Sequence, residues 1–376
     1  MRATRALRAR LGYSEPVVDY ALDRLFEDVT RESLRSVIES ELGSLEALDG
    51  FVARRGRPDV FFRGVPRAAI LSSETTIGVA LPHLLFALCA KAHVDVKDRE
   101  DGLLGSFMQT VREERPELAA LAHVESWSGE DVAHAALHLA GADTVVAFGA
   151  DSTLRAIRAQ LKPEARFEAF GRRISAGYVA RETLRDEQTA SECARCAARD
   201  ALLYDGSGCL SLHVLFVERG SVIDPAAFRK LLLRAFETLA IEFPSAMPED
   251  PQSVAYRRRL EFVQTQHAGT DFAAGAYVLV ALDPWTDEPP PLVRRVLPLY
   301  SVDGPGEALA FIERHRLPLE GFAACPAERA DVRDVALRSG AARIARLGRL
   351  QAPPLAGNHG AKERVLPFVQ AIYRDE

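Results

Sequence analysis

The 376-residue chain lacks the features that would place it at once among nucleic-acid-binding or membrane-spanning proteins. Its 47 Lys and Arg are outnumbered by 53 Asp and Glu, for a net charge of −6, whereas nucleic-acid binders usually carry a basic excess. The longest apolar stretch, residues 77–92, is interrupted by Pro82, His83 and Lys91 and is too short to cross a bilayer. The Arg-rich residues 1–12 have no apolar core after them, as a secretory signal would. We therefore expect no nucleic-acid partner and no membrane span.

Cysteine is scarce and follows no regular framework. The five cysteines are Cys89, Cys193, Cys196, Cys209 and Cys325. An odd number without a pattern indicates reduced thiols and a cytoplasmic setting. Cys193 and Cys196 have no second pair at zinc-finger spacing, and His134 and His138 lack the Glu of H-E-x-x-H. We expect each pair to share only a helix face, and we expect no metal site.

Periodic apolar segments predict two α/β units, in keeping with about two domains for this length. Strands are expected at 68–71, 93–97, 144–148 and 166–170, with helices at 77–91, 106–113, 131–140 and 154–161. This alternation predicts a parallel, doubly wound sheet with helices on both faces. Beyond Arg185, further strands are expected at 210–217, 276–282 and 296–302, with helices at 187–203, 225–239, 307–315 and 331–339.

Cys209 is the thiol whose surroundings indicate reactivity. It follows the turn Gly206-Ser207-Gly208 and opens an apolar strand. Glycine permits close approach of a substrate, and turn N–H groups that face a pocket can acidify a thiol. A free cysteine is more often a small buried hydrophobe, as we expect for Cys89 and Cys325. The residues alone leave both roles open for Cys209.

Two positions are candidates for binding a phosphate or a ribose. Gly149 ends an expected strand, and the helix start near Ser152 has free N–H groups that can hold a phosphate. This junction is not the G-x-G-x-x-G fingerprint, which the chain lacks, and a capped helix without a ligand is the alternative. Lys97 ends another expected strand, at the edge where open α/β sheets bind ligands. A solvated surface lysine is its alternative.

Four segments in order carry patterns shared with one enzyme family. Residues 69–100 end in Val96-Lys97-Asp98-Arg99-Glu100, similar to V-x-K-P-x-E. Residues 143–179 contain Phe170-Gly171-Arg172-Arg173-Ile174-Ser175, similar to f-G-x-k-x-S.

The other two segments lie further along the chain. Residues 205–218 place Gly208-Cys209 before a strand, like G-Q-x-C, and residues 348–355 are similar to a C-terminal pattern. Together the four segments resemble the aldehyde dehydrogenase superfamily and, more narrowly, its acyl-CoA reductase branch, the LuxC-type fatty-acyl reductases.

The resemblance implies an aldehyde-dehydrogenase-like α/β fold of two doubly wound domains. Residues 1–185 would form the Rossmann-like nicotinamide-cofactor-binding domain and 186–347 the catalytic domain, with 348–376 packing back on the body. The implied reaction is NAD(P)H-dependent reduction of an acyl-CoA or carrier-bound acyl thioester to an aldehyde, through an acyl group on Cys209. NADPH is the expected cofactor and NADH the alternative. A homo-oligomer is left open.

The resemblance also assigns cofactor residues. Lys97 and Glu100 match the ribose region, Gly149 and Ser152 fall at the diphosphate-proximal helix start, and Gly171 belongs to the same cofactor site.

Two departures keep other functions open. Glu74 stands where the family has an oxyanion-hole Asn, and a carboxylate there would oppose an oxyanion. Glu168 aligns with the general base that oxidising members use to activate water. The alternatives are therefore an aldehyde dehydrogenase working in the oxidative direction, with Glu168 as base, and a non-catalytic member of the fold.

Overall fold

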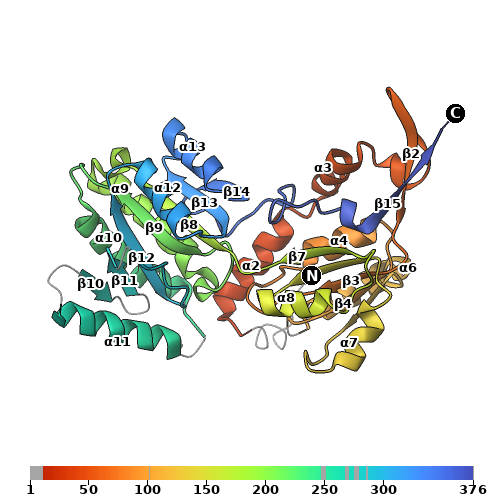
Figure 1. Cartoon of the computed structure of the whole chain (residues 1–376), viewed down its shortest axis with the longest axis horizontal. Coiled ribbons are helices and arrows are strands. Elements are labelled where there is room, and N and C mark those ends of the chain that lie inside the picture. Colours follow the sequence, from red (N-terminus) through yellow and green to blue (C-terminus); the bar gives the residue numbers. More distant parts are fainter. Residues whose placement is uncertain are drawn as a thin grey trace. The chain divides into compact units, whose positions relative to one another are not determined.

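The chain folds into two compact units, each built on its own sheet (Figure 1). The computed structural model describes residues 12–100, 102–246, 251–266, 271–274, 279–284 and 287–375. Unit 1 comprises residues 18–172 and 354–375, and unit 2 comprises residues 12–17 and 173–353.

Unit 1 contains a five-stranded parallel sheet in the order β5-β4-β3-β6-β7. Its strands are β3 (Ala68–Leu71), β4 (Val94–Lys97), β5 (Ala122–Glu125), β6 (Thr144–Phe148) and β7 (Arg166–Phe170). The chain order reverses between β3 and β6, so their carboxyl ends form a topological switch point, where such sheets bind ligands.

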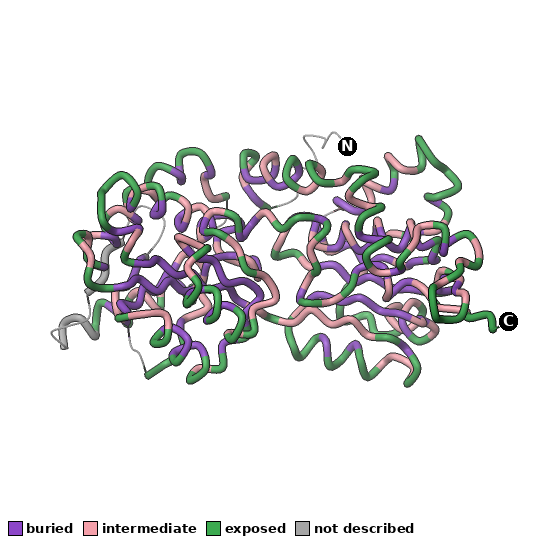
Figure 2. The backbone as a smooth tube through the Cα atoms, turned by 90° about the horizontal axis from the view of Figure 1, so that it is seen from above, coloured by how far each residue is buried: buried purple, intermediate pink, exposed green. Residues whose placement is uncertain are grey.

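Alternate residues of these strands pack against different helices. Ile70 and Val96 join a core with α4 and α5, whereas Leu71 and Val145 pack with α7 and α8. The inner strands β3 and β6 are therefore buried on both faces, whereas the edge strands β5 and β7 are partly exposed. Figure 2 shows that the buried stretches of the chain run through its interior. The helices are α2 (Glu15–Glu27), α3 (Arg31–Leu42), α4 (Leu81–Cys89), α5 (Leu103–Glu114), α6 (Pro116–Ala119), α7 (Val132–Leu139) and α8 (Asp151–Arg158), with the 3-10 turns η1 (Glu46–Leu48) and η4 (Leu366–Phe368).

A three-stranded antiparallel sheet completes unit 1. Its order is β1-β2-β15, and its strands are β1 (Val52–Arg54), β2 (Arg57–Gly64) and β15 (Val369–Arg374). Phe62 on β2 packs with Val37 and Ile38 of α3 and with Val365. The C-terminal strand is thereby held against a segment some three hundred residues earlier in the chain.

Unit 2 contains a seven-stranded sheet in the order β10-β11-β12-β9-β8-β13-β14. Within the described strands, β10 and β11 pair antiparallel and the other neighbours pair parallel. The strands are β8 (Ile174–Val179), β9 (Leu212–Glu218), β10 (Asp271–Ala274), β11 (Leu279–Leu282), β12 (Val296–Val302), β13 (Leu319–Cys325) and β14 (Arg343–Arg346).

Aromatic side chains fill the core of unit 2. Tyr178, Phe216 and Phe322 come from the neighbouring strands β8, β9 and β13 and meet Phe311 of α12. The helices are α9 (Glu187–Leu202), α10 (Pro225–Glu242), α11 (Pro251–Gln266), α12 (Pro305–Arg314) and α13 (Ala330–Arg338), with the 3-10 turns η2 (Arg181–Leu184) and η3 (Leu203–Gly206).

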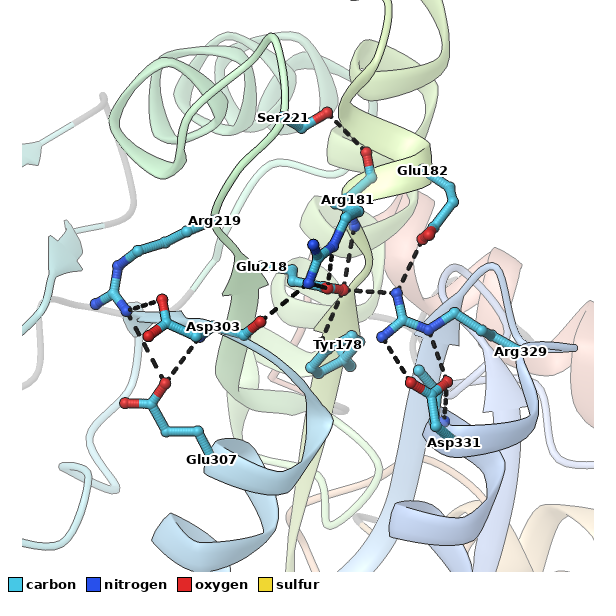
Figure 3. A network of polar contacts seen from close by, with 11 residues as sticks. Tyr178, Arg181, Glu182, Glu218, Arg219, Ser221, Asp303, Glu307, Arg329 and Asp331 are labelled. Atoms are coloured by element: carbon cyan, nitrogen blue, oxygen red, sulfur yellow. Dashed lines mark hydrogen bonds and ion pairs between the residues drawn. The ribbon is translucent and has the colours of Figure 1, made fainter.

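A polar network closes the carboxyl end of this second sheet (Figure 3). Glu218, the last residue of β9, is fully buried and accepts hydrogen bonds from Tyr178 Oη at 3.0 Å and from Arg329 Nη1 at 2.6 Å. Arg181 also pairs with Glu218, and Arg329 makes a bidentate pair with Asp331 at 2.7 and 3.0 Å. Burial favours the neutral acid, but the hydrogen bonds from Arg329, Arg181 and Tyr178 outweigh it and lower the pKa of Glu218. The network therefore holds an ionised carboxylate inside the unit.

The predicted doubly wound architecture is confirmed, and the expected strands at 144–148, 166–170 and 296–302 match β6, β7 and β12. The compact units divide after Arg172, instead of after Arg185, because β8 pairs with β9 and β13 of the second sheet. Part of the strand expected at 276–282 lies outside the described residues.

Candidate functional site

Cys209 lies in unit 2, in the turn between η3 and β9. The residue is half-buried, and its carbonyl accepts a hydrogen bond from Ser175 Oγ at 2.8 Å. A Cβ built on Gly321 would lie 2.7 Å from Ser175 Oγ and 3.4 Å from Leu210 Cδ2. The absence of a side chain at Gly321 of β13 therefore leaves room for the Cys209 turn and for Ser175, which is hydrogen-bonded to it. The turn precedes a strand, as predicted, although β9 begins at Leu212.

Buried hydrogen bonds from the C-terminal segment of unit 2 hold the Cys209 turn in place. Gln351 Nε2 donates to Ser211 Oγ at 2.8 Å and to the carbonyl of Asp200 at 3.2 Å. The amide of Gly208 donates to Ser211 Oγ at 3.2 Å, and the Asp200 carboxylate accepts from the amide of Gly348 at 2.6 Å. The C-terminal segment noted in the sequence is thus the support of the thiol turn.

The thiol of Cys209 is not acidified. Burial of its sulfur raises the pKa of Cys209 to about 12 and the carboxylate of Glu320 adds to the rise, while nearby amides and Arg173 oppose it only in part. Glu320 is itself buried, and its Oε2 lies 3.8 Å from Arg173 Nε. The turn therefore does not acidify the thiol in this structure, and Cys209 carries its proton at neutral pH.

Cys325, at the end of β13, is the acidified thiol instead. A hydrogen bond from Cys193 lowers the pKa of Cys325 to about 6, against the opposing effect of burial. The expectation that Cys325 only packs is thus incomplete. Cys193 lies on α9 and meets Cys325 only in the folded chain, so spacing along the sequence could not reveal the pair.

Predicted cofactor residues gather at the carboxyl edge of the unit 1 sheet. Lys97 ends β4 and is 7% exposed, and its ammonium group lies 5.0 Å from the centre of the Trp127 ring. Burial, followed by repulsion from Arg99, lowers the pKa of Lys97. A buried cation stacked on an indole at a switch point is suited to hold an anionic or ribose group. Trp127, which follows the edge strand β5, was not predicted, because no motif or periodic pattern marks it.

The junction between β6 and α8 lies at the same edge. Ala150 caps α8 without a side-chain hydrogen bond, so the amides of the first turn, at Ser152 and its neighbours, keep their capacity for a phosphate. A Cβ on Gly149 would meet Thr153 only at an ordinary 3.7 Å, which leaves room beside the junction. A Cβ on Gly171 would lie 2.7 Å from Asp151 Oδ1, so glycine there makes space for this carboxylate. The free amides of this helix start are the candidates for a phosphate, and the Asp151 carboxylate lies in the same turn, on the side of Gly171.

A family model for acyl-CoA reductases (LuxC) matches residues 1–359. The chain belongs to this acyl-CoA reductase family. It is accordingly an oxidoreductase whose family reduces acyl-CoA. No curated protein matches this reductase by sequence.

Solved structures with the same fold include aldehyde dehydrogenases. An oxidoreductase from Marinobacter aquaeolei superposes with a TM-score of 0.66 at 12% identity, over 97% of this chain and 85% of that chain. A NAD-dependent benzaldehyde dehydrogenase from Corynebacterium glutamicum gives 0.60 at 13%, over 98% and 87%. The indole-3-acetaldehyde dehydrogenase AldA of P. syringae, in complex with NAD+ and IAA, gives 0.65 at 17%, over 98% and 86%. At these identities the likeness establishes the fold.

Glu100 of the reductase has a different role from the one the sequence indicated. It is 3% exposed and accepts hydrogen bonds from the amides of Gly78 and Ala80, ahead of helix α4. Burial raises the pKa of Glu100 to about 8. The carboxyl group is therefore committed to the start of α4 and is not turned toward a ribose.

Glu168, on β7, is held in ion pairs. Its Oε1 accepts from Arg166 Nε at 2.8 Å, and its Oε2 lies 3.2 Å from Lys362 Nζ. Burial alone would raise the pKa of Glu168, but these two cations lower it overall. A carboxylate with a depressed pKa and both oxygens engaged is a weak base, so the geometry disfavours the base role.

Glu74, where the family Asn is expected, is 69% exposed and lies 3.2 Å from Arg99 Nη2. This ion pair places the Arg99 guanidinium beside the Glu74 carboxylate, whose charge would oppose an oxyanion.

None of the described helices of the reductase is long and apolar enough to cross a membrane.

Proposed function

We propose that this reductase converts an acyl-CoA or carrier-bound acyl thioester into an aldehyde through a thioester on Cys209. The observation that carries the proposal is the position of the turn, in which Ser175 and the Gln351–Ser211 contact hold the half-buried Cys209 ahead of β9. Precise placement of a nucleophile accounts for much of the rate that an enzyme gains.

In the proposed first step, Cys209 Sγ attacks the carbonyl carbon of the acyl thioester. The bond from that carbon to the CoA or carrier sulfur breaks, and the departing sulfur takes up the proton that Cys209 gives up. NADPH, when bound, supplies the hydride that reduces the acyl carbon. Cys209 Sγ then leaves the reduced carbon as the aldehyde forms, and the thiolate takes up a proton from solvent in place of the one that left with the CoA or carrier sulfur.

We propose NADPH as the cofactor, with NADH as the alternative. Lys97, Gly149, Ser152 and Gly171 are the residues that would hold it, because they share the carboxyl edge of one sheet at its switch point. The burial of Glu100 supports NADPH, since a free carboxylate beside the ribose would repel a 2′-phosphate.

The experiment is turnover with matched thiol variants. Acyl-CoA should cause NADPH absorbance to fall and an aldehyde to appear, and Cys209→Ala should slow this by at least about a thousandfold. Cys89→Ala removes a half-buried thiol of unit 1 and should retain the wild-type rate. Equal rates for Cys209→Ala and the wild type would refute the covalent route. Oxidation of aldehyde with no reduction of thioester would favour the oxidative alternative.

We further propose that the reductase acts in the cytoplasm as a homo-oligomer. All five cysteines are free thiols, which supports a reducing compartment. The antiparallel sheet of unit 1 ends in β1 and β15, and edge strands offer backbone groups for pairing with a second copy. Light scattering of the purified chain should give at least twice the mass of one chain.

A further inference from the structure

Three histidines gather around one carboxylate in unit 1. His138 Nε2 lies 2.7 Å from Glu125 Oε1, and His134 Nε2 lies 2.9 Å from the same oxygen. His123 Nε2 is 3.6 Å from it. One ligand atom each from Glu125, His134 and His138 falls within 4.8 Å of the other two. Sequence analysis paired the two helix histidines but did not connect them with Glu125.

The fold explains why these residues meet. Strands β4 and β5 pair in parallel with Asp95 opposite His123 and Lys97 opposite Glu125, so all four side chains belong to one face of the sheet. That face is the one covered by α7.

Helix α7 supplies the two remaining histidines. Its N-cap, Asp131, accepts a hydrogen bond from the amide of His134 at 2.9 Å, which fixes where the helix starts. His134 and His138 are four residues apart and therefore lie one above the other on the same side of the helix. Two imidazoles are thus directed at the end of the edge strand.

A second carboxylate and an aromatic ring set the orientation of His138. Asp95 Oδ2 lies 3.3 Å from His138 Nδ1, on the side of the ring away from Glu125. The Trp127 ring stacks on the imidazole at 4.9 Å with an interplanar angle of 21°. When a cation replaces the contact of Nε2 with Glu125, Nδ1–H facing Asp95 would leave the Nε2 lone pair to the ion, which is the usual arrangement of a metal-binding histidine. Asp95 Oδ2 also lies 3.8 Å from Arg67 Nη2. The positive charge of Arg67 partly offsets the negative charge that Asp95 brings to the histidine cluster.

We propose that Glu125, His134 and His138 bind a divalent transition cation of the Zn²⁺ type, with Asp95 as the positioning residue. Two imidazoles and one carboxylate are a known donor set for zinc, and they leave a coordination position for water or for His123. Bonds of about 2.0–2.2 Å place the ligand atoms of a tetrahedral site roughly 3.3–3.5 Å apart, so the present hydrogen-bonded atoms need to separate by about half an ångström. The side chains of Glu125, His134 and His138 are 29%, 33% and 14% exposed, so an ion can reach them from solvent.

The test is Zn²⁺ binding by the full chain, freed of any histidine tag and stripped with a chelator. Competition with a chromogenic chelator should show one Zn²⁺ per chain with a Kd of about 10 µM or tighter. His134→Ala and His138→Ala should each weaken binding at least about tenfold, and Asp95→Asn should weaken it by about tenfold through the orientation of His138. His93→Ala alters an exposed histidine just before β4 and is the matched control, with affinity unchanged.

Two further measurements keep the outcome decisive. Substituting Co²⁺ gives a visible absorption band whose intensity reports four-coordination, and the double variant His134→Ala/His138→Ala should lose it. If that variant does not fold by circular dichroism, Glu125→Gln takes its place, because its side chain is partly exposed and contributes little to a core. Binding weaker than the stated affinity, or binding that these substitutions leave unchanged, would overturn the proposal.

Discussion

Among single residues, the thiols show most clearly how the fold sets chemistry. Cys209 has the turn and the position expected of the nucleophile, yet burial and Glu320 raise the pKa of Cys209 to about 12. Cys325 has no motif, yet a hydrogen bond from Cys193 lowers the pKa of Cys325 to about 6. Reactivity toward a general reagent and reactivity toward the substrate are therefore expected to lie on different cysteines.

Alkylation should reveal this difference. At pH 7, a thiol with a pKa near 6 is roughly nine-tenths ionised, whereas one near 12 is ionised to roughly one part in 100,000. Iodoacetamide should therefore modify Cys325 first, as followed by peptide mass spectrometry against time. Cys325→Ser should remove the fast phase and Cys209→Ser should leave it. Faster modification of Cys209 than of Cys325 would contradict the assigned acidities.

His83, on α4, is a second residue whose environment overrides its type. It is 1% exposed, and within the described structure neither ring nitrogen has a hydrogen-bond partner. The rings of Phe148, Phe170 and His359 surround it, with centroids 5.5, 5.2 and 5.8 Å away. Burial, followed by the charge of Arg364 and other cationic groups, holds the pKa of His83 well below its usual value.

This burial predicts a loss of stability in mild acid. Below the ordinary histidine pKa of about 6.5, the unfolded chain binds a proton that folded His83 excludes, so the free energy of unfolding falls as the pH falls. One such group contributes a slope of at most about 1.4 kcal/mol per pH unit. His83→Leu should flatten the decline between pH 7.5 and 5, measured by urea denaturation. The exposed His93→Leu should keep the wild-type slope, and an unchanged slope in His83→Leu would contradict this account.

At the scale of elements, buried ion pairs join the ends of strands. Glu218 at the end of β9 meets Tyr178 of β8 and Arg329, just before α13 (Figure 3). An ion pair of this kind is costly to break from one side, because the remaining charge stays buried.

Removing one partner should therefore destabilise the protein strongly. Arg329→Met leaves Glu218 with Arg181 and Tyr178 only, and it should lower the free energy of unfolding by about 3 kcal/mol. Arg219→Met is the matched control, because Arg219 pairs with Asp303 and Glu307, which are 83% and 53% exposed. Exposed pairs contribute less than about 1 kcal/mol. The free energy of unfolding of both variants is measured by chemical denaturation. Equal decreases in the two variants would show that burial does not determine how much an ion pair contributes to stability.

At the scale of the whole molecule, the sequence predicted what depends on local pattern. Short apolar runs predicted β6, β7 and β12 to the residue, and the ordered motifs identified the family, which the match over residues 1–359 confirms. The antiparallel pairing of β2 with β15 was not predicted, because the partners lie about three hundred residues apart.

The site residues divide in the same way. Cys209 was singled out as a candidate from its turn, whereas the commitment of Glu100 to the start of α4 depends on amides 20 and 22 residues away. The pairing of Glu168 with Lys362 and the approach of Glu125 to α7 likewise follow from tertiary packing that no spacing records.

The central claim is that Cys209 carries the acyl group, and trapping that group tests it most directly. The protein is incubated with an acyl-CoA without NADPH, quenched in acid and mapped by peptide mass spectrometry. The account predicts one acyl adduct, located on Cys209 and absent from Cys209→Ser, with one equivalent of CoA released. An adduct on Cys325 that persists in Cys209→Ser, or turnover without any acyl-enzyme, would contradict it.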